Sequence, residues 1–108
     1  MKTYMLLFYG LEFKPDSVTS EDYAKSWQDW IAALEATGNV LSSLPFEWSG
    51  KKVTGASSED LALDAADAGG YMLVKAESID AATEIAKGAP HMVLGGTTIV
   101  RPCVEGTK

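Results

Sequence analysis

The sequence predicts an α+β sandwich, in which two helices pack on one face of an antiparallel sheet. Three observations predict this class: an apolar strand at the N-terminus, a long amphipathic helical segment after it, and a shorter helical segment near the C-terminus, each between strand-like segments. The order amounts to two β-α-β halves, whose right-handed crossovers bring the strands into one sheet. We expect a single domain over residues 1–108, because a chain of this length has room for one core.

The first half begins with a strand from Lys2 to Tyr9, in which both alternating sets of side chains are apolar or aromatic. A helix is predicted over residues 19–38, with Thr19 or Ser20 as its N-cap. Gly38 suits the left-handed position that follows the last turn of a helix. The predicted apolar stripe of this helix consists of Tyr23, Trp27, Trp30, Ile31 and Leu34.

The middle of the chain is predicted to hold a second strand over residues 39–48, and Pro45 within it indicates an edge strand or a bulge. The sequence Ser-Gly-Lys-Lys at 49–52 favours a turn that leads to a short segment around Val53. Residues 55–70 combine small side chains with Asp and Glu and show no sustained period. They are predicted to form an acidic loop.

The second half is predicted to contain a strand at Tyr71–Glu77, a helix over residues 79–87 with Ser78 as N-cap, and a last strand at Thr97–Val104. This order predicts a ferredoxin-like βαββαβ sandwich. Because the first strand is apolar on both faces, the sheet face away from the helices needs a cover from outside. We therefore expect a homodimer that packs sheet face against sheet face.

Composition excludes several classes of function. Fifteen acidic and nine basic residues give a net charge of −6, which disfavours nucleic acid as a partner. No segment approaches the roughly 20 apolar residues of a membrane helix, so no membrane partner is expected. The single cysteine, Cys103, cannot form a disulfide within the chain, which favours the cytoplasm. No motif requires a metal or another cofactor.

His91 is the only histidine, and its side chain alone has an ordinary pKa near neutrality. It is the candidate catalytic residue for acid–base chemistry at pH 7. The alternative is a solvated residue in the loop between Pro90 and Gly95, stabilised by the negative end of the preceding helix. The sequence alone leaves both interpretations open.

Five further residues are candidates for ligand binding. Trp27 and Trp30 lie on the stripe of the first helix, where they form either a pocket wall or part of an aromatic core. Arg101 interrupts an apolar strand, which indicates either an anion-binding group or a partner for a carboxylate. The phenols of Tyr9 and Tyr71 complete the predicted ligand-binding set.

Three stretches match the pattern of a known family. They are KTYMLLFYG at residues 2–10, WQDWIAALEATGNV at 27–40 and GGYMLVKAESIDAATEIAKGAPHMVLGGTTIVRP at 69–102. They resemble the YCII-related family, also called DGPF-type, of the dimeric α/β-barrel superfamily. The resemblance implies a ferredoxin-like protomer, a dimer, and a cleft between sheet and helices.

A few members of that family resemble lyases or dehydrohalogenases that act on small unsaturated acids, with a histidine and an aspartate on and just after the first helix. The first helix here has no histidine, and SEDLALDAADAGG at residues 58–70 stands where the Asp-Gly-Pro-Phe tetrapeptide is expected. Haem-binding relatives of the superfamily rely on a histidine, so the resemblance also leaves haem ligation by His91 open.

Three functions remain open. The first is a homodimeric protein whose cleft binds a small organic molecule, with no catalysis required. The second is an enzyme of the lyase or isomerase type on a small unsaturated organic acid, in which His91 moves a proton and Arg101 holds the carboxylate. The third is a non-catalytic regulatory or interaction module, whose open sheet face recruits another chain.

Overall fold

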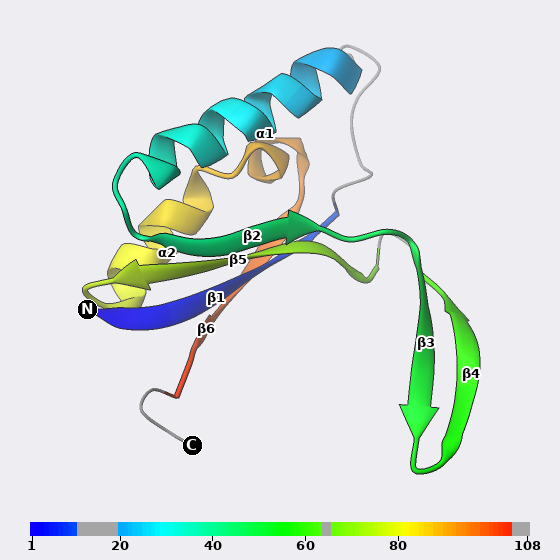
Figure 1. Ribbon diagram of the computed structural model, residues 1–108. Coiled ribbons are helices and arrows are strands. Elements are labelled where there is room, and N and C mark those ends of the chain that lie inside the picture. Colours follow the sequence, from blue (N-terminus) through cyan, green and yellow to red (C-terminus); the bar gives the residue numbers. More distant parts are fainter. Residues whose placement is uncertain (11–19, 64–65, 105–108) are drawn as a thin grey trace.

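The computed structural model describes residues 1–10, 20–63 and 66–104. Two helices lie on one face of a four-stranded antiparallel sheet with the order β2-β5-β1-β6 (Figure 1). This confirms the ferredoxin-like α+β sandwich. The elements are β1 (Lys2–Tyr9), α1 (Ser20–Glu35), β2 (Val40–Pro45), β3 (Ser49–Thr54), β4 (Ser57–Ala62), β5 (Ala68–Ala76), α2 (Ile79–Lys87), the 3₁₀ helix η1 (Pro90–Leu94) and β6 (Thr97–Pro102).

The core lies between β1, β5 and the two helices. Tyr4, Leu6 and Phe8 alternate along β1 and are 3, 0 and 3% exposed. Met72 and Val74 of β5 lie beside them on the same face and are also buried. The predicted strand therefore has its predicted bounds, and one of its two apolar faces is covered within the chain.

Two of the predicted helix ends are confirmed, one after α1 and one before α2. Gly38 follows α1 with a φ of 78°, the left-handed conformation that glycine adopts without strain. The Ser78 hydroxyl accepts a hydrogen bond of 3.1 Å from the backbone N–H of Ala81, which caps α2. At the start of α1, Ser20 is already helical, and the alternative cap, Thr19, lies outside the described residues. None of the described helices is long and apolar enough to span a bilayer.

The middle of the chain corrects two expectations. Residues 49–52, predicted as a turn, belong to β3, and residues 57–62 of the predicted acidic loop form β4. The turn lies at Gly55, whose φ of 59° suits the first position of a two-residue hairpin turn. Every residue of both strands is exposed, so no burial imposes the apolar alternation by which a strand is recognised in sequence. Residues 64 and 65 of the predicted loop lie outside the described ranges.

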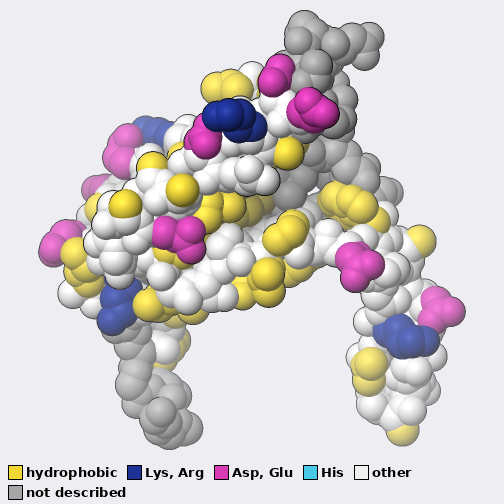
Figure 2. All heavy atoms as spheres, turned by 45° about the horizontal axis from the view of Figure 1, so that its top comes forward, with side chains coloured by type: hydrophobic (Ala, Val, Ile, Leu, Met, Phe, Trp, Pro, Cys, Tyr) yellow, Lys and Arg dark blue, Asp and Glu magenta, His cyan; other side chains and the backbone are white. Residues whose placement is uncertain are grey.

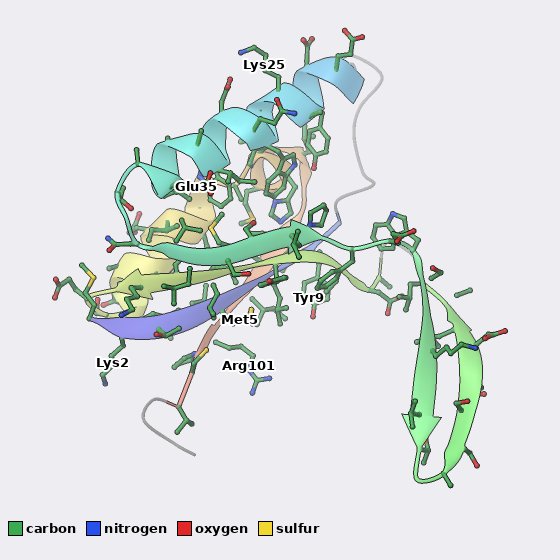
Figure 3. The ribbon with its side chains drawn as sticks, viewed as in Figure 1. Lys2, Met5, Tyr9, Lys25, Glu35 and Arg101 are labelled. Atoms are coloured by element: carbon green, nitrogen blue, oxygen red, sulfur yellow. The ribbon has the colours of Figure 1, made fainter. Side chains whose placement is uncertain are left out.

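The second face of the four-stranded sheet carries the remaining apolar side chains. We call it the open face, and it includes Met5, Leu7 and Tyr9 of β1, which are only half-buried. Leu44 of β2 and Ile99 of β6 are 60% and 43% exposed. Met5 and Tyr9 point away from the helices in Figure 3. The helices thus cover one side of the sheet and leave the other without cover from the described chain.

Candidate functional site

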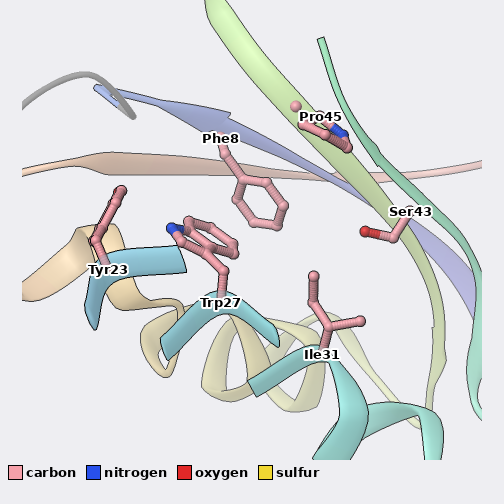
Figure 4. Close-up of a pocket in the computed structure, with 7 residues that line it drawn as sticks. Phe8, Tyr23, Trp27, Ile31, Ser43 and Pro45 are labelled. Carbon is pink, nitrogen blue, oxygen red and sulfur yellow. The ribbon is translucent and has the colours of Figure 1, made fainter. Parts of the chain in front are cut away.

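A pocket lies between α1 and the helix-covered face of the sheet (Figure 4). Its volume is about 240 Å³, just below the roughly 300–1,000 Å³ of typical ligand pockets. Apolar side chains also gather in the hollow between α1 and the sheet in Figure 2. The pocket is lined by Phe8 of β1, by Tyr23, Trp27 and Ile31 of α1, by Ser43 and Pro45 of β2, and by Gly70 of β5. Its size suits one ring with a few substituents.

Aromatic rings build the inner wall of this pocket. Trp27 meets Phe8 edge-on, with 5.2 Å between ring centroids and an interplanar angle of 61°. Trp30 stands behind both rings, 5.6 Å from Trp27 and 6.0 Å from Phe8. Its indole lies against Gly88, because a Cβ at that position would sit 2.9 Å from the indole Nε1. The wall is therefore fixed from both the strand side and the α2 side.

The lining offers two hydroxyl groups. The Tyr23 hydroxyl is buried and has no hydrogen-bond partner among the described residues. Burial raises the pKa of Tyr23, and the neighbouring Trp27 side chain opposes that rise. Ser43 adds a half-buried hydroxyl from β2. Both hydroxyl groups contribute little to the surface of the pocket, which is almost entirely apolar.

His91 lies inside the protein and not in a solvated loop. It belongs to η1, is 0% exposed, and stacks on Trp27 with 5.2 Å between ring centroids and an interplanar angle of 26°. Phe8 meets the imidazole edge-on at 5.3 Å. A Cβ at Gly96 would sit 2.3 Å from His91 Cδ2, so only glycine leaves room for the ring. The expectation of a solvated residue is therefore wrong, because the chain turns at Gly95–Gly96 and packs the imidazole against α1.

The hydrogen bonds of His91 fix its tautomer. Nε2 lies 3.0 Å from the carbonyl oxygen of Thr97, which can only accept, so Nε2 carries the proton. The Thr98 hydroxyl lies 3.2 Å from Nε2 and donates to the sulfur of Met92. Nδ1 then holds a buried lone pair with no partner among the described residues. Burial lowers the pKa of His91, and the bond to Thr97 offsets part of that effect, so the ring is neutral at pH 7.

The structure does not bring the predicted site residues together. Trp27 lines the pocket, whereas Trp30 supports it and borders a separate groove between α1 and η1. Tyr9, Tyr71 and Arg101 lie on the open face, across the sheet from the pocket. The Tyr71 hydroxyl is hydrogen-bonded to Ser42, and Arg101 has no ion pair within 4.0 Å in the described ranges.

Sequence reasoning missed most of the pocket lining. Tyr23 lies on the predicted helical stripe but is not among the predicted site residues, although it lies four residues before Trp27 and so on the same side of α1. Ser43 gives a weaker signal, as a polar residue in a partly apolar strand. Phe8, Ile31, Pro45 and Gly70 carry no signal of their own, because apolar residues line cores and pockets alike.

The residues around His91 do not fit a haem. An axial ligand needs a ring nitrogen that faces open space. Here Nε2 is bonded to Thr97, and the ring is enclosed by Trp27, Phe8 and Gly96. Within the described residues, no group of three or more His, Cys, Asp or Glu side chains lies close enough to hold a metal ion.

Comparisons with known proteins support the fold. No family model matches the chain, and no curated protein matches it. Among solved structures, it is similar to 5-chloro-2-hydroxyhydroquinone dehydrochlorinase (TftG) from Burkholderia phenoliruptrix AC1100, in complex with 2,5-dihydroxybenzoquinone. The TM-score is 0.55 at 20% sequence identity, and the match covers 96% of this chain and 95% of that one. The chain therefore shares its fold with an enzyme whose structure holds a small ring compound.

Proposed function

We propose that this chain is a YCII-related protein that acts as a homodimer and binds a small, flat ring compound between α1 and the sheet. The observation that carries the proposal is the pocket of about 240 Å³ walled by Phe8 and Trp27. Aromatic walls favour flat ligands, because rings pack edge-on or offset against each other. The similar fold of a dehydrochlorinase in complex with a dihydroxybenzoquinone supports the same ligand class.

The described lining favours a neutral ligand over the small organic acid that the sequence suggested. No Lys or Arg is among the residues that line the pocket, and Arg101 lies across the sheet. A carboxylate buried among these side chains would lack a counter-charge, which costs several kcal/mol. A neutral ring avoids that cost, because the surface of the pocket is almost entirely apolar.

Titration of two probe compounds into ¹⁵N-labelled protein tests this proposal. We expect 1,3-dihydroxybenzene to shift the indole signal of Trp27, and benzoate, which is charged, to bind at least about tenfold more weakly. Ile31→Trp fills the pocket and should weaken binding of the neutral ring by at least about tenfold. Val53→Trp on β3, an exposed residue outside the pocket lining, is the matched control and should leave that binding unchanged. Absence of shifts around Phe8, Tyr23 and Trp27 at millimolar ligand would overturn the proposal.

The homodimer is the second part of the proposal. The open face presents Leu7, Leu44 and Ile99, and a second copy can cover it by a sheet-to-sheet contact. Sedimentation velocity at micromolar concentration should give a dimer. A monomer would overturn the proposed homodimer. It would favour the alternative function, an interaction module that recruits a different chain. A cytoplasmic location belongs to the same proposal, since Cys103 is a free thiol.

Proton transfer by His91 in a lyase or isomerase is a second candidate function, and one observation favours it. The neutral imidazole keeps a lone pair on Nδ1 that no described group uses. Because Nδ1 is buried, a substrate can reach that atom only if the side chains around it move. His91→Ala separates the two functions: a binder keeps its ligand, whereas an enzyme loses about two to four orders of magnitude in kcat.

A further inference from the structure

The ribbon formed by β3 and β4 stands clear of the rest of the molecule (Figures 1 and 2). All residues of both strands are exposed, and among the described elements they pack chiefly on each other. A two-stranded ribbon on its own is marginally stable in water. The ribbon therefore needs a surface to pack on that the described residues of the protomer do not provide.

The direction of the ribbon indicates where that surface lies. The ribbon leaves the sheet on the side away from the helices (Figure 1), the same side to which Met5, Tyr9 and Arg101 point (Figure 3). A body that covers the open face must therefore also lie against the ribbon. The open face and the ribbon meet at an angle, so a single partner can contact both.

Apolar side chains connect the two surfaces. Phe46 stacks on Tyr71 of the open face, with 5.9 Å between centroids and an interplanar angle of 25°. From there the chain runs to Trp48 at the base of the ribbon, and Leu61, which is 39% exposed, lies opposite Gly50 in the register of β3 and β4. The apolar surface thus continues from the sheet onto the ribbon, as one interface would require.

Charged groups on the two surfaces complement each other. Arg101 on β6 has no carboxylate within 4.0 Å among the described residues. Glu59 on β4 has no cation within that distance there, and the basic residue directly opposite it in the register is Lys52 of β3. The Lys51–Asp60 pair, at 2.7 Å, occupies the other side of the ribbon. β6 and β2 are the two edges of the sheet, and the ribbon follows β2. Arg101 and Glu59 therefore belong to opposite edges of the protomer.

We propose that the ribbon is an arm that lies along β6 of a second copy of this chain, with Glu59 facing Arg101 of the partner subunit. A two-fold axis parallel to the strands brings the β2 edge of one copy beside the β6 edge of the other, so that the same contact forms twice. This inference rests on the proposed homodimer. It adds a contact in which the ribbon of each copy packs on β6 of the other. It also assigns Arg101 to the interface and not to the ligand pocket.

A spin label on the arm tests this arrangement. Ala56→Cys in a Cys103→Ser background carries the label at the turn, and this protein is mixed with ¹⁵N-labelled, unmodified chain. We expect the label to reduce the intensity of the β6 amide signals in the ¹⁵N copy by at least half. A label at Lys25→Cys, on the exposed side of α1, is the control and should leave those signals unchanged.

The outcomes separate the arm from the function on which it rests. A dimer whose β6 signals are unaffected overturns the arm and leaves the homodimer standing. A monomer in the same sample overturns both, and ligand binding in the pocket is still measured independently by the titration above.

Charge reversal gives a second test that does not depend on a label. Arg101→Glu and Glu59→Arg should each weaken the dimer by about threefold or more, because each places like charges together. The double variant should recover to near the wild-type dissociation constant. Glu21→Arg on α1 is the matched control and should have no effect. A double variant as weak as the two single changes combined would overturn the contact.

Discussion

β1 has two apolar sides, and the described chain covers only one of them. Tyr4, Leu6 and Phe8 are buried beneath the helices, whereas Met5, Leu7 and Tyr9 remain half-buried on the open face. The two sides have similar composition, so composition does not decide which is covered. The right-handed crossovers decide it, because they place both helices on one face. The difference shows that the helices bury one side of β1, whereas the described residues leave the other side without a cover.

The largest expected effect separates the two sides of β1 directly. Leu6→Ala removes a side chain that is 0% exposed and should lower the free energy of unfolding by about 2–5 kcal/mol at any protein concentration. Leu7→Ala is the matched change one residue away, and its cost should grow with protein concentration, since a second copy buries Leu7 in the proposed homodimer. Urea denaturation at several concentrations measures both. Equal losses of unfolding free energy in the two variants, independent of protein concentration, would contradict this difference between the two sides of β1.

Alanine substitutions at two glycines compare the helix-covered region with the exposed ribbon. Gly96→Ala places a Cβ 2.3 Å from His91 Cδ2 and 2.8 Å from the His91 carbonyl oxygen, so the ring or backbone must shift. We expect a loss of about 1–3 kcal/mol. Gly50→Ala on β3 meets nothing closer than 3.7 Å and should change stability by less than about 0.5 kcal/mol. Thermal unfolding of the two variants measures both changes in stability. Similar losses of stability in the two variants would contradict the prediction.

The smallest expected effect is a pH dependence of the helix-covered side. The pKa of His91 is lowered in the folded protein, so below about pH 6.5 the unfolded chain binds a proton that the folded chain resists. The contribution of His91 is therefore complete above that pH and is lost as the pH falls below it, with a slope of at most about 1.4 kcal/mol per pH unit. His91→Gln removes this contribution. The difference between wild type and variant, measured from pH 7.5 to 5, should show the slope; a flat difference would mean that the buried ring accepts a proton freely.

The elements that the sequence predicts well are those with local signals. Lys2–Tyr9 alternates, the stripe from Tyr23 to Leu34 has a helical period, and Gly38 and Ser78 mark helix ends by the chemistry of capping. Each signal lies within one segment and does not depend on what packs against it. The bounds of β1 are therefore confirmed to the residue.

What the sequence could not provide depends on register and on neighbours. Tyr9 and Phe8 are adjacent and differ only in face, so a ligand role for Tyr9 required knowing which face the helices cover. The burial of His91 depends on the close approach of Gly96. A contact of this kind leaves no periodic pattern in the sequence. The bounds of the ribbon could not be predicted, because exposed strands such as Ser57–Ala62 lack the alternation that burial imposes.

The strand order has a consequence for the way the chain is made. β1 emerges first during synthesis, yet it lies between β5 and β6, and its pairing with β6 joins Tyr4 to Pro102. Until that last strand has left the ribosome, β1 has an unpaired edge next to an apolar face. Such distant pairing slows folding and exposes the nascent chain to association with other chains. A chain that stops before Thr97 would keep that edge permanently and become a substrate for chaperones and proteases.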